Sequence, residues 1–251
     1  MASRRGQMLD GVLLLDKPEG LSSNHALQRA KRALDARKAG HTGTLDPFAT
    51  GLLVCCLGRA TKISSSMLEA DKVYEATVRL GEETDSGDLT GHIVFQEPPD
   101  AEPVAQSRLE AVLEQFRGPI EQIPPMHSAL KRDGKPLYEY ARQGIELERP
   151  PRQVTIYRLE LLSFDGRDAR ILVHCSKGTY IRTLAQDIGR ALGCGGHLSA
   201  LRRTQVGPFR LDDGVGLETL QQMSEPQSVL IAPQDLPPGL WPENLKSKDQ
   251  L

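Results

Sequence analysis

The segment GHTGTLDPFATGLL, residues 40–53, constrains the fold of this chain more than any other stretch. Its three glycines permit backbone angles that other residues avoid, and Pro47 pushes Asp46 out of the helical region toward an extended conformation. The segment therefore predicts a rigid loop that holds one carboxylate. Short polar side chains precede this carboxylate and offer it hydrogen-bond partners: His41, Thr42 and Thr44. An isolated Asp-Pro is a common turn, but these neighbours favour an active-site loop.

Composition limits the class of protein. A length of 251 residues, with 39% hydrophobic and 25% charged residues, fits one large globular domain or two small ones. The sequence has no run of about 18 apolar residues and no apolar stretch of a signal peptide near its start. We therefore expect a soluble, cytoplasmic protein with no membrane contact. The four cysteines have no CxxC spacing, so we expect reduced thiols, with Cys55 and Cys56 buried.

Charge is unevenly distributed along the chain, although the formal net charge is only -2. Residues 151–210 hold ten Lys or Arg against four Asp or Glu, a net of +6, and residues 211–251 hold two against seven, a net of -5. A basic segment in a mildly acidic protein indicates a local anionic partner, with nucleic acid as the first candidate. A solvated basic face is the alternative that charge alone leaves open.

Hydrophobic patterning predicts the elements around the Asp46 loop. An apolar strand begins at residue 11, the chain turns at residues 17–20, and a helix follows with Ser22 or Ser23 as its cap. The other expected elements are a buried strand at 52–57, a short helix at 59–69, strands at 72–81 and 197–206, and a helix at 107–117.

Residues 123–152 differ in composition, because they combine five prolines with few aliphatic residues. This pattern predicts an insertion that protrudes from the core. Basic and aromatic residues together suit contact with phosphates and stacking on bases, whereas a mobile solvated loop is the alternative. The residues concerned are Lys131, Arg132, Lys135, Tyr138, Tyr140 and Arg142.

A hairpin and a helix are expected after this insertion. Residues 153–165 and 169–176 are alternating β-prone runs joined at Gly166, and the second run feeds into a helix with a clean apolar face and Thr179 as its natural cap. Arg182 then lies in the first turn of the helix, where a cation opposes the helix dipole by about 0.3 to 1 kcal/mol. A carboxylate partner or a phosphate would account for it.

The sequence contains no GxSxG, P-loop or HExxH motif, so nothing indicates a hydrolytic triad, a nucleotide site or a zinc site. A carboxylate such as Asp46 can still act alone, as a covalent nucleophile or a base, if a neighbour keeps it ionised and aimed. Arg182 is the candidate, because an opposite charge at about 4 to 6 Å lowers a carboxylate pKa by roughly 1 to 3 units. Tyr74 can stack on a substrate ring and move a proton, or it is a core tyrosine.

A set of ordered motifs between about residue 10 and about residue 210 resembles the bacterial tRNA pseudouridine synthase B family, TruB. The motifs are LLLDKPEGLSS, AGHTGTLDPFATGLL, GRATK, KVYEA, IPPMHSALKRDGKPLYEYARQG and CSKGTYIRTLAQDIG. The resemblance implies an α+β pseudouridine synthase fold, in which a mixed, mostly antiparallel sheet with flanking helices forms a central catalytic cleft.

The same resemblance implies an enzyme, a tRNA pseudouridine(55) synthase of the isomerase (intramolecular transferase) class. Its substrate would be the uridine at position 55 in the T loop of tRNA, which must flip out of the RNA stack to react. The partner implied is the T-arm stem-loop of tRNA. No metal, no cofactor and no obligatory protein partner are implied, and we expect a monomer.

Site residues follow from the same resemblance. Asp46 matches the catalytic aspartate, which either attacks the anomeric carbon or removes the sugar 2′ proton to give a glycal. Tyr74 matches the tyrosine that stacks on uracil and takes the proton from carbon 5, and Arg182 matches the arginine paired with the aspartate. The remaining matches are substrate-binding positions: His41, Tyr180 and Leu201 around the flipped base, and Lys17, Lys62 and Asp88 as supporting polar groups.

The domain organisation expected is a catalytic domain over residues 1–212, with residues 123–152 as an RNA-binding loop that closes on the T-arm. Residues 213–251 form a short C-terminal extension. Bacterial members of the family usually carry a further PUA-like RNA-binding region, for which this extension has no room. Either the chain is a truncated form or this member of the family is naturally short. We expect catalysis to survive, and the affinity for tRNA stays open from the sequence.

Two other functions remain open from the sequence. The basic segment and the basic insertion fit a tRNA-binding folding factor whose catalysis is incidental. A guide-directed synthase within a larger particle, as in archaeal and eukaryotic relatives, is the second alternative. It is disfavoured because those relatives also depend on the C-terminal region that the chain lacks.

Overall fold

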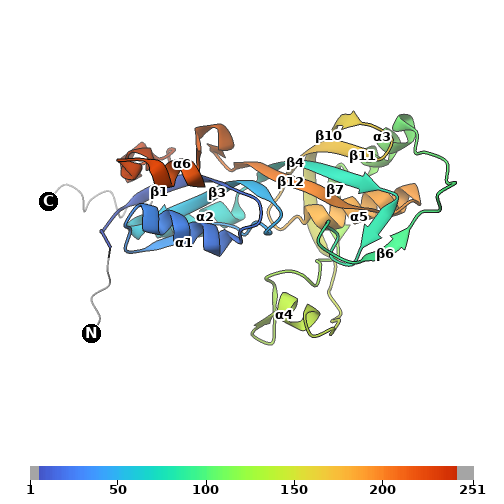
Figure 1. Ribbon diagram of the computed structural model, residues 1–251, viewed down its shortest axis with the longest axis horizontal. Coiled ribbons are helices and arrows are strands. Elements are labelled where there is room, and N and C mark those ends of the chain that lie inside the picture. Colours follow the sequence, from blue (N-terminus) through green and yellow to red (C-terminus); the bar gives the residue numbers. More distant parts are fainter. Residues whose placement is uncertain (1–5, 242–251) are drawn as a thin grey trace. The chain divides into compact units, whose positions relative to one another are not determined.

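The computed structural model describes residues 6–241. These residues form two compact units (Figure 1). Unit 1 contains residues 6–73 and 202–241 of the described range, and unit 2 contains residues 74–201. The chain passes between the units within two strands, β4 (Lys72–Leu80) and β12 (Gly196–Val206).

Unit 1 combines a small mixed sheet with short helices. Strand β1 pairs antiparallel with β3 and parallel with β14, β2 pairs antiparallel with β3, and the end of β12 pairs parallel with β3. The elements of unit 1 are β1 (Gly11–Lys17), α1 (Ser23–Ala33), β2 (Ala39–His41), β3 (Thr50–Leu57), η1 (Gly58–Ile63), α2 (Ser64–Glu69), β13 (Phe209–Arg210), η2 (Leu211–Asp213), β14 (Val215–Gly216), α6 (Leu217–Gln222), η3 (Pro226–Val229) and η4 (Pro233–Asp235).

Both faces of the β1–β3 pair are buried, which explains their continuous apolar sequences. One face packs against α1 and α6, and the other packs against η1, α2 and the region around Phe209 and Trp241. Cys55 and Cys56 alternate between these two cores and are free thiols. The predicted cap of α1 is confirmed, because Ser22 Oγ accepts a hydrogen bond of 3.2 Å from the backbone N–H of His25.

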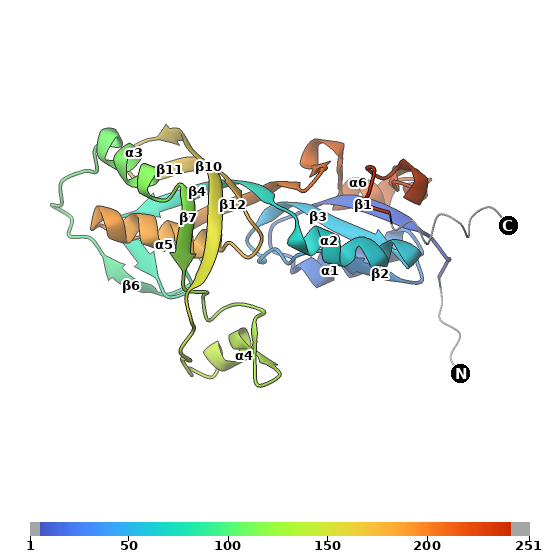
Figure 2. The same ribbon diagram turned by 180° about the vertical axis from the view of Figure 1, so that it is seen from behind.

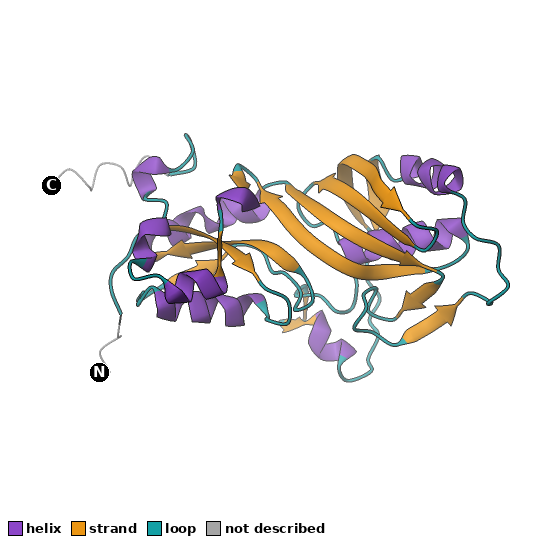
Figure 3. Ribbon diagram, turned by 45° about the horizontal axis from the view of Figure 1, so that its top comes forward, coloured by secondary structure: helices purple, strands orange, loops and turns teal. Residues whose placement is uncertain are grey.

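Unit 2 is built on an antiparallel arrangement of long strands (Figure 3). Strand β10 pairs with both β11 and β7, and the strand order continues through β4 to β12. The elements of unit 2, besides its parts of β4 and β12, are β5 (Glu82–Thr84), β6 (Ile93–Gln96), α3 (Gln106–Gln115), β7 (Gly118–Gln122), β8 (Lys131–Arg132), β9 (Lys135–Pro136), α4 (Leu137–Ala141), β10 (Arg152–Phe164), β11 (Asp168–Cys175) and α5 (Ile181–Leu192).

Helix α5 has the apolar face that the sequence predicted, and its cap differs from the prediction. The five residues of the predicted face are all buried: Ile181, Leu184, Ala185, Ile188 and Leu192. The helix begins after Tyr180. The Thr179 hydroxyl donates a hydrogen bond of 2.9 Å to the carbonyl oxygen of Ser176 and does not cap the helix. The prediction of Thr179 as the cap was therefore wrong, because this hydroxyl closes the preceding turn.

The insertion at residues 123–152 connects the end of β7 to the start of β10 and projects from the sheet of unit 2 (Figure 2). It contains a small hairpin, β8–β9, whose turn residues Asp133 and Gly134 both have positive φ angles. Such a two-residue Asp-Gly turn matches the twist of a hairpin. The insertion also contains α4, so it carries regular structure of its own and is more than the loop predicted.

The fold class expected from the resemblance is confirmed. The structure is α+β, and its strand pairing is mostly antiparallel, whereas β1 with β14 and β12 with β3 pair in parallel. Residues 213–241 belong to unit 1, where α6 contacts α1. The expected boundary after residue 212 and the reach of the C-terminal extension stay predictions, and residues 242–251 lie outside the described residues.

One backbone position in unit 1 tests this arrangement. Gly51 has a φ of +99°, and a Cβ atom there would overlap the carbonyl oxygen of Arg203 on β12. We predict that Gly51→Ala lowers the free energy of unfolding by about 3 kcal/mol or more, because strain and overlap combine. Gly40→Ala is the control, since nothing lies within 4 Å of its Cβ position. Urea unfolding measures both, and equal midpoints for the two variants would contradict the close strand approach.

Candidate active site

The Asp46 loop joins β2 to β3 and is held by backbone hydrogen bonds at several points. The buried hydroxyl of Ser23 makes two hydrogen bonds with the backbone of Leu45. It accepts one of 2.7 Å from the N–H and donates one of 2.9 Å to the carbonyl oxygen. The N–H of Ala49 donates to the carbonyl of Asp46, and the N–H of Gly20 donates to the carbonyl of Pro47. Asp46 itself is half-buried. The loop is therefore tied to the β1–α1 connection on one side and to itself on the other.

Lys17, at the end of β1, is fully buried beneath this loop. Its ammonium group donates hydrogen bonds to three carbonyl oxygens, those of Pro18 at 2.8 Å, Leu21 at 2.7 Å and Pro47 at 3.3 Å. Burial lowers the pKa of Lys17 to about 8, and attraction by Asp46 opposes this shift. The structure thus brings two predicted site residues, Lys17 and Asp46, into electrostatic contact.

His41 and Lys62 are the other predicted residues in unit 1. His41 ends β2, and burial together with the positive charge of Arg203 lowers the pKa of its imidazole. The imidazole is therefore neutral near pH 7. Its Nδ1 atom and the buried Thr42 hydroxyl have no hydrogen-bond partner among residues 6–241. Lys62 lies on η1 and is exposed.

In unit 2, Arg182 is buried at the start of α5 and binds several acceptors. Its guanidinium donates to the carbonyl oxygens of Ser86 at 3.2 Å and of His127 at 2.6 Å, and it lies 3.7 Å from Asp88 Oδ2. A carboxylate partner therefore does compensate the cation at the helix start, as the sequence required. This partner is Asp88, another predicted site residue.

Asp88 is itself fixed by its neighbours. Its Oδ1 atom accepts hydrogen bonds from the Ser86 hydroxyl at 2.9 Å and from the Thr90 N–H and hydroxyl at 2.9 and 2.5 Å. A carboxylate oxygen with this many donors is held in one orientation. The other oxygen remains for Arg182, so the two side chains form a fixed pair.

The remaining predicted residues of unit 2 are Tyr74, Tyr180 and Leu201. Tyr74 lies on β4 and is 9% exposed, and Leu201 lies on β12 and is 8% exposed. Tyr180 is held by Gln122, whose side-chain amide accepts from its N–H at 3.0 Å and donates to its carbonyl at 3.2 Å. Because Asp46 belongs to unit 1, its ion pair with Arg182 and the catalytic cleft around it stay predictions.

Two residues that hold the backbone around the site, Gln122 and Arg203, were given no role by the sequence analysis. Gln122 lies 58 positions from Tyr180, so no local pattern links them. Arg203, buried on β12, could have been found, because it shares the period-2 face of the buried Leu201. A charged residue at a buried strand position must find polar partners.

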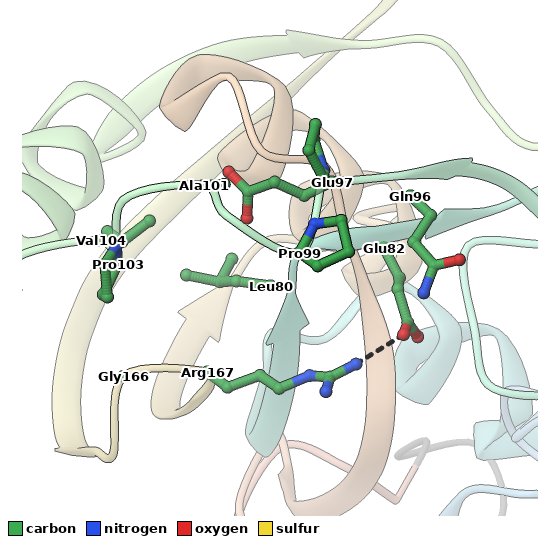
Figure 4. Close-up of a pocket in the computed structure, with 12 residues that line it drawn as sticks. Leu80, Glu82, Gln96, Glu97, Pro99, Ala101, Pro103, Val104, Gly166 and Arg167 are labelled. Carbon is green, nitrogen blue, oxygen red and sulfur yellow. Dashed lines mark hydrogen bonds and ion pairs between the residues drawn. The ribbon is translucent and has the colours of Figure 1, made fainter.

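Unit 2 contains a cavity of about 610 Å³ (Figure 4). Its lining includes Leu80, Glu97 and several prolines, together with the ion pair between Glu82 and Arg167. None of the nine predicted site residues contributes to it. No three His, Cys, Asp or Glu side chains within residues 6–241 group as metal ligands. No helix in the same range is long and apolar enough to cross a membrane.

Comparison with protein families identifies two matching models. The model described as "TruB family pseudouridylate synthase (N terminal domain)" matches residues 31–181. The model described as "tRNA pseudouridylate synthase B C-terminal domain" matches residues 182–233. Together they cover most of both units.

Curated relatives agree with the family models. The tRNA pseudouridine synthase B of Bordetella avium is 73% identical over 242 residues, which cover 96% of this chain and 99% of that protein. The protein of the same name from Aromatoleum aromaticum is 59% identical over 94% of this chain and 76% of its own length. Similarity at this level extends through both units of the fold.

Solved structures give the same architecture. A Cbf5-Nop10-Gar1 complex contains a chain that is 34% identical with a TM-score of 0.68 over 85% of this chain. An H/ACA RNP bound to a substrate RNA containing 2′-deoxyuridine contains one that is 27% identical with a TM-score of 0.67 over 92% of this chain. This chain spans about half to two thirds of the length of those chains.

The fold, together with these comparisons, defines an RNA-modifying isomerase of the pseudouridine synthase class. Within that class the chain belongs to the TruB family of tRNA pseudouridine synthases. The family expected from the sequence motifs is therefore confirmed.

The buried ammonium of Lys17 predicts an unusual pH dependence. The folded protein releases the Lys17 proton near pH 8, and the unfolded chain releases it near 10.5. Folding therefore releases a proton between these values, and a rise in pH over this window favours the folded state. We predict that the free energy of unfolding of the wild type increases relative to that of Lys17→Met from pH 8 to 10.5.

Lysine side-chain NMR gives the direct check on this prediction. The ammonium of Lys17 should titrate near pH 8, well below the value of about 10.4 for lysine in a model peptide. Titration of the Lys17 ammonium at its unperturbed value, with parallel stability curves for wild type and variant, would contradict the burial of Lys17.

Proposed function

We propose that this enzyme isomerises the uridine at position 55 in the T loop of tRNA, with Asp46 as its catalytic carboxylate. The observation that carries the proposal is the 73% identity to a tRNA pseudouridine synthase B over nearly the full length of both proteins. The held loop around Asp46 supports it, because a single carboxylate that reacts without a cofactor must be aimed accurately.

The reaction breaks one bond to the sugar and forms another. The bond from the anomeric carbon to N1 of uracil breaks, the detached base turns, and carbon 5 bonds to the anomeric carbon. Carbon 5 then loses its proton and N1 gains one, so the formula of the nucleotide does not change. Asp46 assists the first step, either by attack on the anomeric carbon or by removal of the sugar 2′ proton to give a glycal.

Tyr74 and Arg182 are assigned the supporting roles. A tyrosine ring can stack on the flipped uracil while its hydroxyl takes the proton from carbon 5. The Arg182 guanidinium, held by Asp88 and two backbone carbonyls, is aimed in advance and keeps the Asp46 carboxylate ionised. His41, Tyr180, Leu201 and Lys62 complete the substrate-binding set. Lys17 supports it from beneath, because its buried ammonium bonds the backbone of the Asp46 loop.

The insertion at residues 123–152 is proposed to close on the T-arm stem-loop. Lys135 Nζ lies 4.9 Å from the centre of the Tyr140 ring, and Arg142 Cζ lies 5.3 Å from the centre of the Tyr138 ring. These cation–π pairs present charge and aromatic surface together on a small projecting lobe. Such a lobe suits phosphate contact and base stacking, and its closure would exclude water from the reacting nucleotide.

The proposed working form is a monomer in the cytoplasm that acts on free tRNA without a protein partner, metal or cofactor. All four cysteines are free and buried, which fits a reducing compartment. Guide-directed action within a larger particle is the alternative that the H/ACA structures raise, and the two differ in whether free RNA suffices as a substrate.

Replacement of the proposed catalytic carboxylate tests the function. We predict that Asp46→Asn lowers single-turnover pseudouridine formation on an unmodified T-arm stem-loop by about 10²- to 10⁴-fold or more, with RNA affinity within about twofold of wild type. Asp35→Asn is the control, because Asp35 is exposed in the same unit and its positive φ suits asparagine.

This assay, together with a tRNA-folding assay of the same proteins, separates the three functions. Wild-type turnover on the free stem-loop supports the proposal and excludes a requirement for guide RNA. A folded, RNA-bound wild type that leaves the T-loop uridine unchanged rejects it. If Asp46→Asn still promotes tRNA folding, the protein also acts as a folding factor.

The geometry of Arg182 predicts that charge alone cannot replace it. Arg182→Lys should lower turnover by about 10- to 100-fold. The reason is that an ammonium group cannot bond Asp88 and two backbone carbonyls and also point at the Asp46 carboxylate. Arg190→Lys, on the exposed side of the same helix, is the matched control and should stay near wild type. The same assay measures both, and turnover near wild type in Arg182→Lys argues against the proposed aiming of Asp46.

A further inference from the structure

Arg203 is a buried arginine whose bonds go to the Asp46 loop. Its side chain is 2% exposed, and the guanidinium donates from Nε to the carbonyl oxygen of Leu52 at 2.8 Å and from one terminal nitrogen to that of Gly43 at 3.1 Å. No carboxylate within residues 6–241 forms an ion pair with it. Arginine is rarely buried without a charged partner, so this position requires an explanation.

The two carbonyl groups that Arg203 binds lie at opposite ends of the loop. Gly43 lies three positions before Asp46, and Leu52 lies six positions after it. The backbone of β12 also pairs with Gly51 at the exit of the loop, with Arg203 and Gly51 directly opposite each other. One residue therefore contacts the exit of the loop through its backbone and spans both ends through its side chain.

Arg203 also contributes charge to the surroundings of the loop. Its guanidinium lowers the pKa of His41 and adds to the lowering at Lys17, in each case after the larger effect of burial. The groups affected are His41 at the end of β2 and Lys17 at the end of β1. Its position is therefore central to the electrostatics of the loop as well as to its shape.

We propose that Arg203 is a positioning residue that closes the Asp46 loop, so that the carboxylate is aimed before RNA binds. It acts through the carbonyl oxygens of Gly43 and Leu52 and does not touch the nucleotide. This inference rests on the proposed role of Asp46. A residue that only filled the core would affect stability and would leave the turnover of the folded enzyme unchanged.

The distinguishing experiment compares Arg203→Lys with Arg202→Lys. A lysine keeps the charge at position 203 and cannot span two carbonyls, because it lacks the planar fork of donors. Arg202 is the control, because its side chain is 42% exposed and donates to two side chains, the Asp16 carboxylate and the Thr50 hydroxyl, where Arg203 donates to backbone carbonyls. Single-turnover rates on the T-arm stem-loop are measured for both variants, and dissociation constants are measured in an Asp46→Asn background, where no turnover interferes.

We expect Arg203→Lys to lower the single-turnover rate by about 10- to 100-fold, as a small misplacement of the reacting group does, and to keep the dissociation constant within about twofold. Arg202→Lys should match wild type in both. A folded Arg203→Lys with wild-type turnover overturns the proposal, and so does a loss of affinity as large as the loss of rate.

A backbone variant keeps the proposal testable if Arg203→Lys does not fold. An ester in place of the peptide between Gly43 and Thr44 weakens the Gly43 carbonyl as an acceptor and leaves every side chain unchanged. A several-fold slower rate with unchanged affinity supports the role of Arg203, and an unchanged rate overturns it. Wild-type turnover is measured first, so a failure of the proposed function appears there, before any variant is compared.

Discussion

The structure of unit 1 depends on the hydrogen bonding of backbone carbonyl groups by buried side chains. Lys17, Ser23 and Arg203 are each almost fully excluded from solvent, and each bonds the backbone of the Asp46 loop or its flanks. Removing a buried donor from its acceptor costs about 1 to 3 kcal/mol, and more for a charged group. The loop therefore cannot relax on its own, because any shift would leave these groups unsatisfied.

Unit 2 uses the same principle at the start of α5. Arg182 bonds two backbone carbonyls and one fixed carboxylate, and Gln122 bonds both backbone groups of Tyr180. In each unit a long polar side chain fixes irregular backbone that neither helix nor sheet would hold. This is the arrangement expected where catalytic groups must be pre-aligned at the cost of local stability.

Much of the fold could be predicted from the sequence, because apolar periodicity depends on local residue order. The strand at 52–57, the buried face of α5 and the cap at Ser22 were all expected and are observed. The cap of α5 was predicted wrongly, since a hydroxyl near a helix start can also close the turn before it. The position of the boundary between the two units was not predicted, because it falls within β4 and β12, whose sequences have the pattern of uninterrupted strands.

The residues of the candidate site that act through their side chains could be predicted from the sequence. The partners of Arg182 could not be named, because Ser86 and His127 contribute backbone oxygens, which have no sequence signature. Arg203 could have been given a role from the sequence, because it lies on the buried face of β12 and a buried guanidinium needs hydrogen-bond acceptors. Buried arginines on strand faces are therefore worth tracing when a catalytic loop lies nearby in the chain.

The central claim is that the Asp46 loop is already formed in the enzyme without RNA. Amide hydrogen exchange at Leu45 and Thr42 tests it most directly, because these N–H groups donate to the buried Ser23 hydroxyl and to the carbonyl of Val54. The account predicts that both amides exchange as slowly as those of β3, through opening of the whole unit. Exchange at the rate of an exposed, unbonded loop amide would contradict it.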